Sequence, residues 1–384
     1  AETPFSSSTP NPIDHSGGKS LFARLLSMAG GNLGRHIIAF LTKIIPRTFL
    51  ESLWAAVSAK IYNLNSQNNE KIGFKSGDVL FIADAAWNYP AWRAATVARK
   101  QGAKVVTLIY DLMPLRHPEY CFPLLPLQFH SWLMAMSSCS DALICISKAT
   151  LDDLNSWFVE QDSDEEQKEV PARGYFHLGS DQPEAQGGFI RPYLATFFSG
   201  EYPCFACIGS FEKKRNYPLI LQIFNQIWRE GNEVRLIFAG RITPELAEFV
   251  AMLKSHPENQ KRLLVIHDAC DAEISYIYQK SRALLLASSF EGFGLPLIEA
   301  RSRGTIVIAN QIAPFQEIAD PGVFFFDLKY PISLSKLILA HSRTDYRDQF
   351  EPLIPTTWQQ SAMSCQSTIK ALLWKSSASS KDSN

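Results

Sequence analysis

The segment ALLLASSFEGFGLPLIEARSRGTIVIAN, residues 283–310, carries the signals of a strand, a turn, a helix and a second strand. Its uncharged run Ala283 to Ala287 predicts a strand that is buried on both faces, as in a parallel sheet. A turn with Gly292 and Gly294 follows. Pro296 then predicts the first position of a helix, because the missing N–H of proline would have no partner there.

The second half of this segment completes the unit. Gly304 predicts the end of the helix, and Thr305 to Ala309 predicts the next strand. A strand, a glycine turn, a helix and a strand in this order place backbone N–H groups at the carboxyl edge of a sheet, where anions and nucleotides bind. We therefore expect a ligand site on the turn.

Two carboxylates lie on this turn and helix, Glu291 and Glu299. A carboxylate near a helix N-terminus is stabilised by the helix dipole and can accept hydrogen bonds from sugar hydroxyls. A capping role alone would require neither the second carboxylate nor both glycines. The pair, with Gly-Phe-Gly-Leu-Pro between, resembles the E-x7-E signature of the retaining enzymes of glycosyltransferase family 4, which have the GT-B fold.

Length and composition limit the class of protein. The chain has 384 residues, enough for two domains, and its 46% hydrophobic and 12% aromatic content indicates a globular protein. The net charge of −1 argues against a general nucleic-acid binder. Seven scattered cysteines, an odd number, favour a reducing compartment over a disulfide framework, and we read Cys204 and Cys207 as strand residues. No run approaches the roughly 20 apolar residues that a membrane span needs.

Strands and helices alternate in both halves of the chain, which predicts two doubly wound Rossmann-like α/β domains facing a cleft. The expected strands are 78–82, 104–109, 142–146, 204–209, 234–239, 263–266, 283–287, 305–309 and 323–326, and 174–181 is expected to be the last strand and turn of the first domain. The expected division is a disordered segment 1–18, an acceptor-side domain 19–188, a nucleotide-sugar domain 189–357, and a crossing helix with a polar tail, 358–384. In the GT-B fold such a helix, here opened by Trp358, returns to the first domain.

Residues 19–62 differ from the rest of the first domain. Apolar residues at helical spacing alternate there with Lys and Arg, and only Glu51 is acidic. This pattern predicts one or two amphipathic helices. They could dock onto an anionic membrane surface, or they could pack on the sheet of the first domain, and both readings stay open.

Asp111 follows a predicted parallel strand, where open sheets bind their ligands. With His117-Pro118-Glu119, it resembles the D-L-I-P-x-x-x-P-E stretch of family 4 enzymes that build bacterial surface polysaccharides. Tyr110 stands where many members have His, so a role for that His is not carried over. Asp111 could instead cap a helix, and His117 could be an ordinary loop histidine.

A basic turn opens the second domain. Ser210 to Asn216, Ser-Phe-Glu-Lys-Lys-Arg-Asn, follows Gly209 and resembles the family's G-T-x-E-P-R-K-N, with Lys214-Arg215 where the family has Arg-Lys. Adjacent cations just past a sheet edge suit a diphosphate, and the alternative is a solvated basic turn. His267 ends a predicted strand at the place where relatives hold the nucleobase.

The resemblance implies a retaining glycosyltransferase that moves a hexose from a nucleotide-diphosphate sugar to a glycan or lipid-linked acceptor in the cytoplasm. Glu291 would hold the donor sugar, Glu299 its ribose, and Asp111 would face the sugar or the acceptor, with His117 in the substrate site. Lys214, Arg215 and the N–H groups of Phe293, Gly294 and Leu295 would stabilise the leaving diphosphate, with Gly209 and Ser210 beside it.

No cofactor and no metal are expected, because the fixed cations would replace a metal ion. An Asp-Ser-Asp at 162–164 lies in a solvated acidic run with no strand before it, which argues against a metal-binding D-x-D. The Asp-Leu-Met-Pro segment favours GDP-mannose as the donor. Contact with the inner face of the membrane depends on residues 19–62.

Two alternatives remain. The chain could be a non-catalytic GT-B relative that binds nucleotide or glycan, or serves as a partner subunit. It could also be a GT-B sugar-nucleotide epimerase. The strand and glycine-rich loop that usually open the first domain of GT-B enzymes are not recognisable, since Gly17-Gly18 and Gly30-Gly31 have no strand before them.

Overall fold

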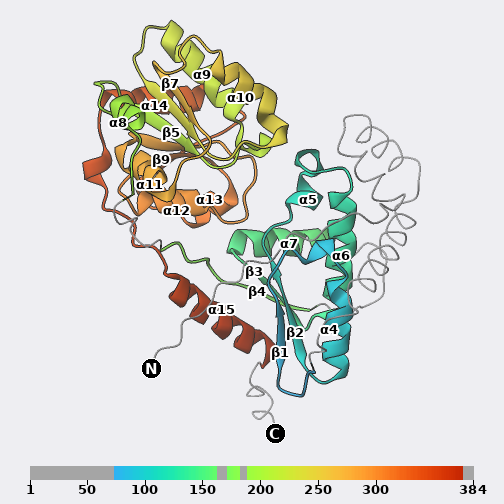
Figure 1. Ribbon diagram of the computed structural model, residues 1–384. Coiled ribbons are helices and arrows are strands. Elements are labelled where there is room, and N and C mark those ends of the chain that lie inside the picture. Colours follow the sequence, from blue (N-terminus) through green and yellow to red (C-terminus); the bar gives the residue numbers. More distant parts are fainter. Residues whose placement is uncertain (1–72, 162–170, 182–187, 375–384) are drawn as a thin grey trace, which may run out of the picture.

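The computed structural model describes residues 73–161, 171–181 and 188–374. The predictions for residues 1–18 and 19–62 and for the acidic run lie outside these ranges. Within the described ranges, the chain forms two parallel sheets with helices on their faces, joined by a helix that runs back from the end of the chain (Figure 1).

The first sheet has four parallel strands in chain order. They are β1 (Val79–Ile82), β2 (Lys104–Ile109), β3 (Ala142–Cys145) and β4 (Ala172–Tyr175). Successive side chains of a strand point to opposite faces, so Val105 packs under helices α4 (Ala91–Lys100) and α6 (Leu125–Cys139), while Val106 packs on the other face. Both faces are therefore covered, as a parallel sheet requires.

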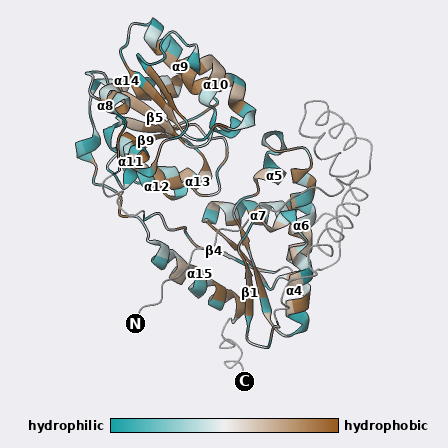
Figure 2. Ribbon diagram, viewed as in Figure 1, coloured by the Kyte–Doolittle hydropathy of each residue, from teal (hydrophilic) through white to brown (hydrophobic). Residues whose placement is uncertain are grey.

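The second sheet has six parallel strands in the order β10-β9-β8-β5-β6-β7. Their bounds are β5 (Cys204–Ile208), β6 (Arg235–Ala239), β7 (Leu263–Ile266), β8 (Ala283–Leu286), β9 (Ile306–Asn310) and β10 (Val323–Phe326). The order reverses beside β5, between β8 and β6, and ligands of open α/β sheets bind at such a reversal. Hydrophobic residues concentrate on the strands of both sheets (Figure 2).

Helices cover both faces of the second sheet. One apolar core holds α9 (Tyr217–Arg229), α10 (Ala247–Lys254) and α14 (Ile332–Arg343). The other holds α8 (Pro192–Phe198), α11 (Asp271–Lys280), α12 (Leu295–Arg301) and α13 (Ala313–Glu317). The doubly wound architecture predicted from the sequence is confirmed in both halves.

The predicted crossing helix is present. α15 (Trp358–Leu373) contacts β4 and β3 of the first sheet. Thr357 opens it with a capping box, in which the Gln360 N–H donates to Thr357 Oγ1 at 3.1 Å and the Thr357 N–H donates to Gln360 Oε1 at 2.8 Å. The last helix of the chain thus completes the first domain.

The remaining helices complete the two domains. They are α5 (Met113–Arg116), α7 (Lys148–Gln161) and the 3-10 turns η2 (Ala86–Asn88), η3 (Pro118–Tyr120), η4 (Lys213–Arg215), η5 (Pro244–Leu246) and η6 (Arg347–Gln349). No helix in the described parts of the chain is long and apolar enough to span a bilayer.

Two predicted elements need correction. The apolar, tryptophan-containing stretch 122–136 predicts a helix, and the helix observed there is α6, Leu125–Cys139, because a proline at its start sets the first turn. The strand expected to begin at Gly174 and to end in a turn before Asp181 is β4, Ala172–Tyr175, which begins earlier. Gly174 lies against α15, where a β-carbon would be 3.1 Å from Leu372, and the chain after Tyr175 leaves the sheet towards the second domain.

Candidate active site

The turn after β8 begins α12 at the carboxyl edge of the second sheet. Gly294 precedes the first residue of the helix and has a φ of 119°, which only glycine adopts freely. A β-carbon there would lie 2.9 Å from the ring of Phe315. Gly304 has a φ of 74° and follows the last turn of the helix, which ends at Arg301. The local sequence therefore places the start of α12 where the unit predicts it.

Glu291 lies between the two predicted cations. Its Oε2 is 3.6 Å from Lys214 Nζ, and its Oε1 is 3.5 Å from an Arg215 guanidinium nitrogen. All three side chains are about 15% exposed or less. Lys214 Nζ also lies 3.8 Å from Glu212. The structure therefore brings together three residues that the sequence singled out in separate motifs.

These cations retain unused donors. Among the residues that the structure describes, neither Lys214 nor Arg215 donates a side-chain hydrogen bond, and the buried Arg215 Nε has no partner. Burial lowers the pKa of Arg215, but the negative groups around it, Glu291 foremost, more than offset this effect. A charged, largely buried guanidinium with free N–H groups is suited to binding an anion such as a diphosphate.

Asn216 joins the basic turn to the acidic loop. Its φ of 55° is left-handed, and its Nδ2 donates to the Ala287 carbonyl and to Ser289 Oγ, both at 2.8 Å. The Ser289 N–H in turn donates to the Lys214 carbonyl at 2.8 Å. Sequence reasoning assigned Asn216 no role, although it stood at the end of the quoted basic motif.

Glu299 is held by a residue that the sequence did not single out. Tyr278 donates its hydroxyl to Glu299 Oε2 at 2.9 Å. Tyr278 is buried, and burial first, then the charge of Glu299, raises its pKa. The charge of Arg215 acts to lower the pKa of the same Tyr278 hydroxyl, so Arg215 and Glu299 are both near Tyr278. Tyr278 keeps its proton and orients the carboxylate.

Asp111 has both of the contacts between which the sequence left a choice. Its Oδ1 accepts the N–H of Met113, the first residue of α5, at 2.9 Å, although the N-cap position of that helix is Leu112. It also lies within electrostatic range of Lys214 and Glu291 of the second domain. Burial raises its pKa, Glu291 adds to this, and the Met113 N–H and Lys214 oppose it. The hydrogen bond to the start of α5 and a place at the cleft are therefore compatible.

His117 reaches the second domain. Its ring lies 5.1 Å from the ring of Phe290, the neighbour of Glu291, and stacks on Tyr120 at 5.6 Å. Its Nδ1 is 3.0 Å from Glu119 Oε1. A pocket of about 440 Å³ lies here between the domains. Its lining is Arg116, His117, Ala149, Thr150 and Asp153 of the first domain and Ser289, Phe290, Glu291, Ile312, Ala313 and Pro314 of the second.

Of the other predicted residues, some lie near this site and one lies elsewhere. Phe293 is buried between the domains, 5.5 Å from the ring of His177, and Leu295 packs on the same apolar cluster. Ser210 is partly buried directly after Gly209. His267 is exposed after the edge strand β7 and lines a different hollow, so the structure does not bring it to the pocket that contains Glu291.

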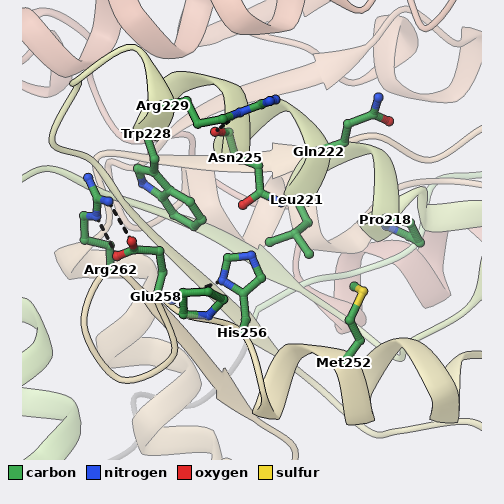
Figure 3. A pocket seen from close by; sticks show the side chains of 11 residues that line it. Pro218, Leu221, Gln222, Asn225, Trp228, Arg229, Met252, His256, Glu258 and Arg262 are labelled. Atoms are coloured by element: carbon green, nitrogen blue, oxygen red, sulfur yellow. Dashed lines mark hydrogen bonds and ion pairs between the residues drawn. The ribbon is translucent and has the colours of Figure 1, made fainter.

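A further hollow of about 610 Å³ lies between α9 and the segment 252–262 (Figure 3). Trp228 and His256 line it, and Glu258 and Arg262 form a bidentate pair at 2.8 Å on its wall. None of the predicted site residues lines it. Across the described residues, no group of three His, Cys, Asp or Glu side chains is arranged to hold a metal ion.

Comparison with known proteins matches the second domain to a family and the whole fold to solved structures. Residues 195–345 match the family described as Glycosyl transferases group 1. Solved structures with the same fold include the sucrose-phosphate synthase of Thermosynechococcus elongatus, with a TM-score of 0.56, 13% identity and coverage of 86% of this chain and 81% of that one. TarM has a TM-score of 0.51 and 12% identity, covering 76% of this chain and 51% of its own. The chain has the GT-B fold.

Sequence relatives are more specific. The chain is 29% identical over 304 residues to the serotype-specific mannosyltransferase WbdA of Escherichia coli, which covers 77% of this chain and 37% of WbdA. It is 34% identical over 100 residues to the O-antigen chain mannosyltransferase RfbU of Salmonella typhimurium, covering 26% of this chain and 28% of RfbU. The chain thus spans little more than a third of the WbdA proteins that it resembles.

Proposed function

We propose that the chain is a retaining glycosyltransferase. It would move a hexose, with mannose favoured, from a nucleotide-diphosphate sugar to a glycan or lipid-linked acceptor in polysaccharide biosynthesis. The observation that carries the proposal is the pair of cations, Lys214 and Arg215, which face Glu291 with unused hydrogen-bond donors. The mannosyltransferase names of the sequence relatives support mannose as the sugar.

The chemistry follows from charge. Breaking the bond between sugar and phosphate leaves an oxocarbenium-like sugar and a nucleoside diphosphate. Lys214 and Arg215 would stabilise the negative charge that develops on the diphosphate, and this interaction is stronger in the transition state than before it. The proposal includes no metal ion, because these fixed cations supply the countercharge. Glu291 would then exchange its cation contacts for the hydroxyls of the donor sugar.

The remaining polar residues divide between donor and acceptor. Glu299, oriented by Tyr278, would accept the ribose hydroxyls. Asp111 and His117 come from the first domain and would face the transferred sugar or the acceptor. The N–H groups of Phe293 to Leu295 would add to the diphosphate site. Membrane contact through residues 19–62 on the cytoplasmic face stays part of the proposal.

A non-catalytic relative is the second candidate, and Tyr110 favours it. Its hydroxyl donates to the Ala83 carbonyl at 2.7 Å, so this side chain is held by the first domain in the position where many family members have a histidine. Such a protein would bind nucleotide without transferring sugar.

A thermal-shift panel of GDP-, UDP- and dTDP-sugars tests the proposal, because a ligand that binds the folded chain raises its Tm by mass action. We expect one nucleotide to raise the Tm, and its diphosphate to do so more than its monophosphate. Incubation of that sugar nucleotide with candidate acceptors should then give a product with the anomeric configuration of the donor. Product formed from the donor alone would indicate the epimerase, and binding without product the non-catalytic relative.

A further inference from the structure

We propose that Ser147 and Thr150, at the start of helix α7, are positioning residues for Glu291. Their hydroxyl groups tie the Glu291 loop of the second domain to the first domain. The inference rests on the proposed function, since it gives Glu291 a part in sugar transfer. It adds that the placement of Glu291 depends on contact between the domains.

The carbonyl of Gly292 is the group that the first domain holds. Ser147 Oγ donates to it at 2.6 Å and Thr150 Oγ1 at 3.1 Å, so its two lone pairs serve two hydroxyls. Ser147 Oγ in turn accepts the Thr150 N–H at 3.0 Å. Ser147 and Thr150 are both buried. Buried hydroxyls with this full set of partners fix the carbonyl in one place.

The backbone contact at Gly292 is also close. A β-carbon on Gly292 would lie 2.4 Å from the Tyr110 carbonyl oxygen and 3.1 Å from the β-carbon of Asp111. The loop therefore lies directly on the end of strand β2. Because only a glycine fits against Tyr110, the loop can approach the two hydroxyls closely enough for hydrogen bonds.

Glu291 therefore stands between two anchors in different domains. On its amino side, Ser289 is held to Lys214 and Asn216 of the second domain. On its carboxyl side, Gly292 is held to Ser147 and Thr150 of the first. A carboxylate between two such anchors keeps its position only while both domains hold it.

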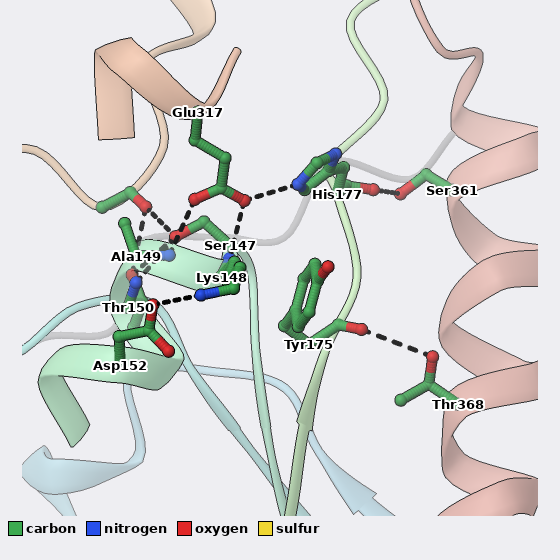
Figure 4. Close-up of polar contacts among 11 residues, drawn as sticks. Ser147, Lys148, Ala149, Thr150, Asp152, Tyr175, His177, Glu317, Ser361 and Thr368 are labelled. Atoms are coloured by element: carbon green, nitrogen blue, oxygen red, sulfur yellow. Dashed lines mark hydrogen bonds and ion pairs between the residues drawn. The ribbon is translucent and has the colours of Figure 1, made fainter. Parts of the chain in front are cut away.

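The same helix end has a second contact with the second domain (Figure 4). Glu317 accepts the Lys148 and Ala149 N–H groups at 2.7 Å each, and His177 Nε2 lies 2.6 Å from its Oε1. A carboxylate at a helix N-terminus is stabilised by the unpaired N–H groups and the dipole. Glu317 thus keeps the start of α7 beside Gly292.

Two readouts on the full chain test the inference. The variants are Ser147→Ala with Thr150→Val, which removes both hydroxyls at nearly constant volume, and Thr150→Ser, which keeps both. Lys148→Ala is the matched control, because among the described residues its side chain forms an ion pair only with Asp152, on the surface, and its N–H remains. Hydrogen exchange of residues 288–295 should become several-fold faster in the double variant and stay unchanged in the other two.

The second readout is the kinetics of transfer with the sugar nucleotide found by thermal shift. We expect kcat of the double variant to fall by about 10- to 100-fold, the effect of misplacing a reacting group by roughly 1 Å, with a nearly constant donor KM. Thr150→Ser should keep most of the activity. If the double variant does not fold, Thr150→Val against Thr150→Ser makes the same comparison.

Several outcomes overturn the inference. Unchanged exchange would mean that the hydroxyls do not hold the loop. A raised KM with unchanged kcat would mean loss of donor binding instead of positioning. Equal losses in Thr150→Val and Thr150→Ser would exclude the hydroxyl as the cause. If the wild-type chain neither binds nucleotide nor transfers sugar, the proposed function fails; faster exchange would still show the interdomain contact, but Glu291 would have no reaction for which to be positioned.

Discussion

The guanidinium of Arg215 lies against the backbone of Gly209, where a β-carbon would be 2.7 Å from its central carbon. Gly209 also has a φ of 140°. Arg215, which we propose to bind the diphosphate, therefore occupies the space that a side chain at Gly209, directly after β5, would need. Only a glycine leaves the guanidinium at the carboxyl edge of the sheet.

Gly209→Ala should displace Arg215 and weaken binding of the nucleoside diphosphate about tenfold, equal to about 1.4 kcal/mol. Titration of the nucleotide that raises the Tm measures this. Gly231→Ala is the matched control, because Gly231 also has a positive φ, 82°, but open space around it. Equal effects in the two variants would mean that backbone strain, and not Arg215, causes the loss.

Arg215 and Glu291 should have separable effects. Arg215→Ala should lower both nucleotide affinity and transfer, because it removes a donor to the diphosphate. Glu291→Ala should lower transfer by about 10²- to 10³-fold, as loss of a transition-state contact does. It should not weaken nucleotide binding, because it removes a negative neighbour of the two cations. Both variants should remain folded by circular dichroism. Near-normal transfer in both would contradict the site assignment.

Asp111→Asn should raise stability at neutral pH and lower transfer. The pKa of Asp111 is raised by burial, so ionisation costs the folded state free energy that the asparagine avoids. A carboxyl group with a raised pKa loses stability as pH rises from its unfolded value, about 3.9, through its folded value. The Tm difference between the variant and the wild type should therefore be positive at neutral pH and shrink on acidification.

The opposite trend, a variant less stable than the wild type at neutral pH, would mean that Lys214 dominates over burial. In that case Asp111 would act chiefly as a partner of the cation and not as a carboxyl group facing the substrate. Melting curves of both chains from pH 3.5 to about 7.5 span the range that decides this.

Arg301 should be among the most important residues for stability. It is fully buried, pairs with Asp320 at 2.8 Å, and donates to the carbonyls of Thr305 and Glu351. Removing one partner of a buried pair costs about 3–5 kcal/mol, so Arg301→Met should lower the free energy of unfolding by roughly that amount. Denaturant titration measures it. Lys148→Met, which breaks an exposed pair with Asp152, is the control and should leave the chain unaffected.

Much of the site could be predicted from short stretches of chain. The basic turn, the Glu291 turn and Asp111 each follow an apolar strand, and the carboxyl ends of parallel strands meet at one edge. The cluster of Lys214, Arg215 and Glu291 follows once the two strands are neighbours. His267 also ends a strand, but β7 lies at the edge of the sheet, and strand order is not written in any local pattern.

The residues that sequence reasoning missed act across long separations. Tyr278 orients Glu299, and Glu317 caps a helix of the other domain. Ser147 directly precedes α7, and its oxygen accepts the Thr150 N–H as a helix cap does. Its hydroxyl proton goes instead to Gly292, 145 positions away. A local motif indicates which kind of hydrogen bond a polar residue can form, but not which distant group will be its partner.

The sequence alone thus determined the two α/β halves, nearly every strand and the turn that carries Glu291. These features follow from hydrophobic periodicity and from the positions of glycine and proline, which depend on neighbours along the chain. Only the tertiary structure decided which strands are neighbours, which side chains share one buried space, and where the first domain forms hydrogen bonds to the Glu291 loop. Those outcomes depend on packing between segments that are distant in sequence, and that packing depends on all the core residues together.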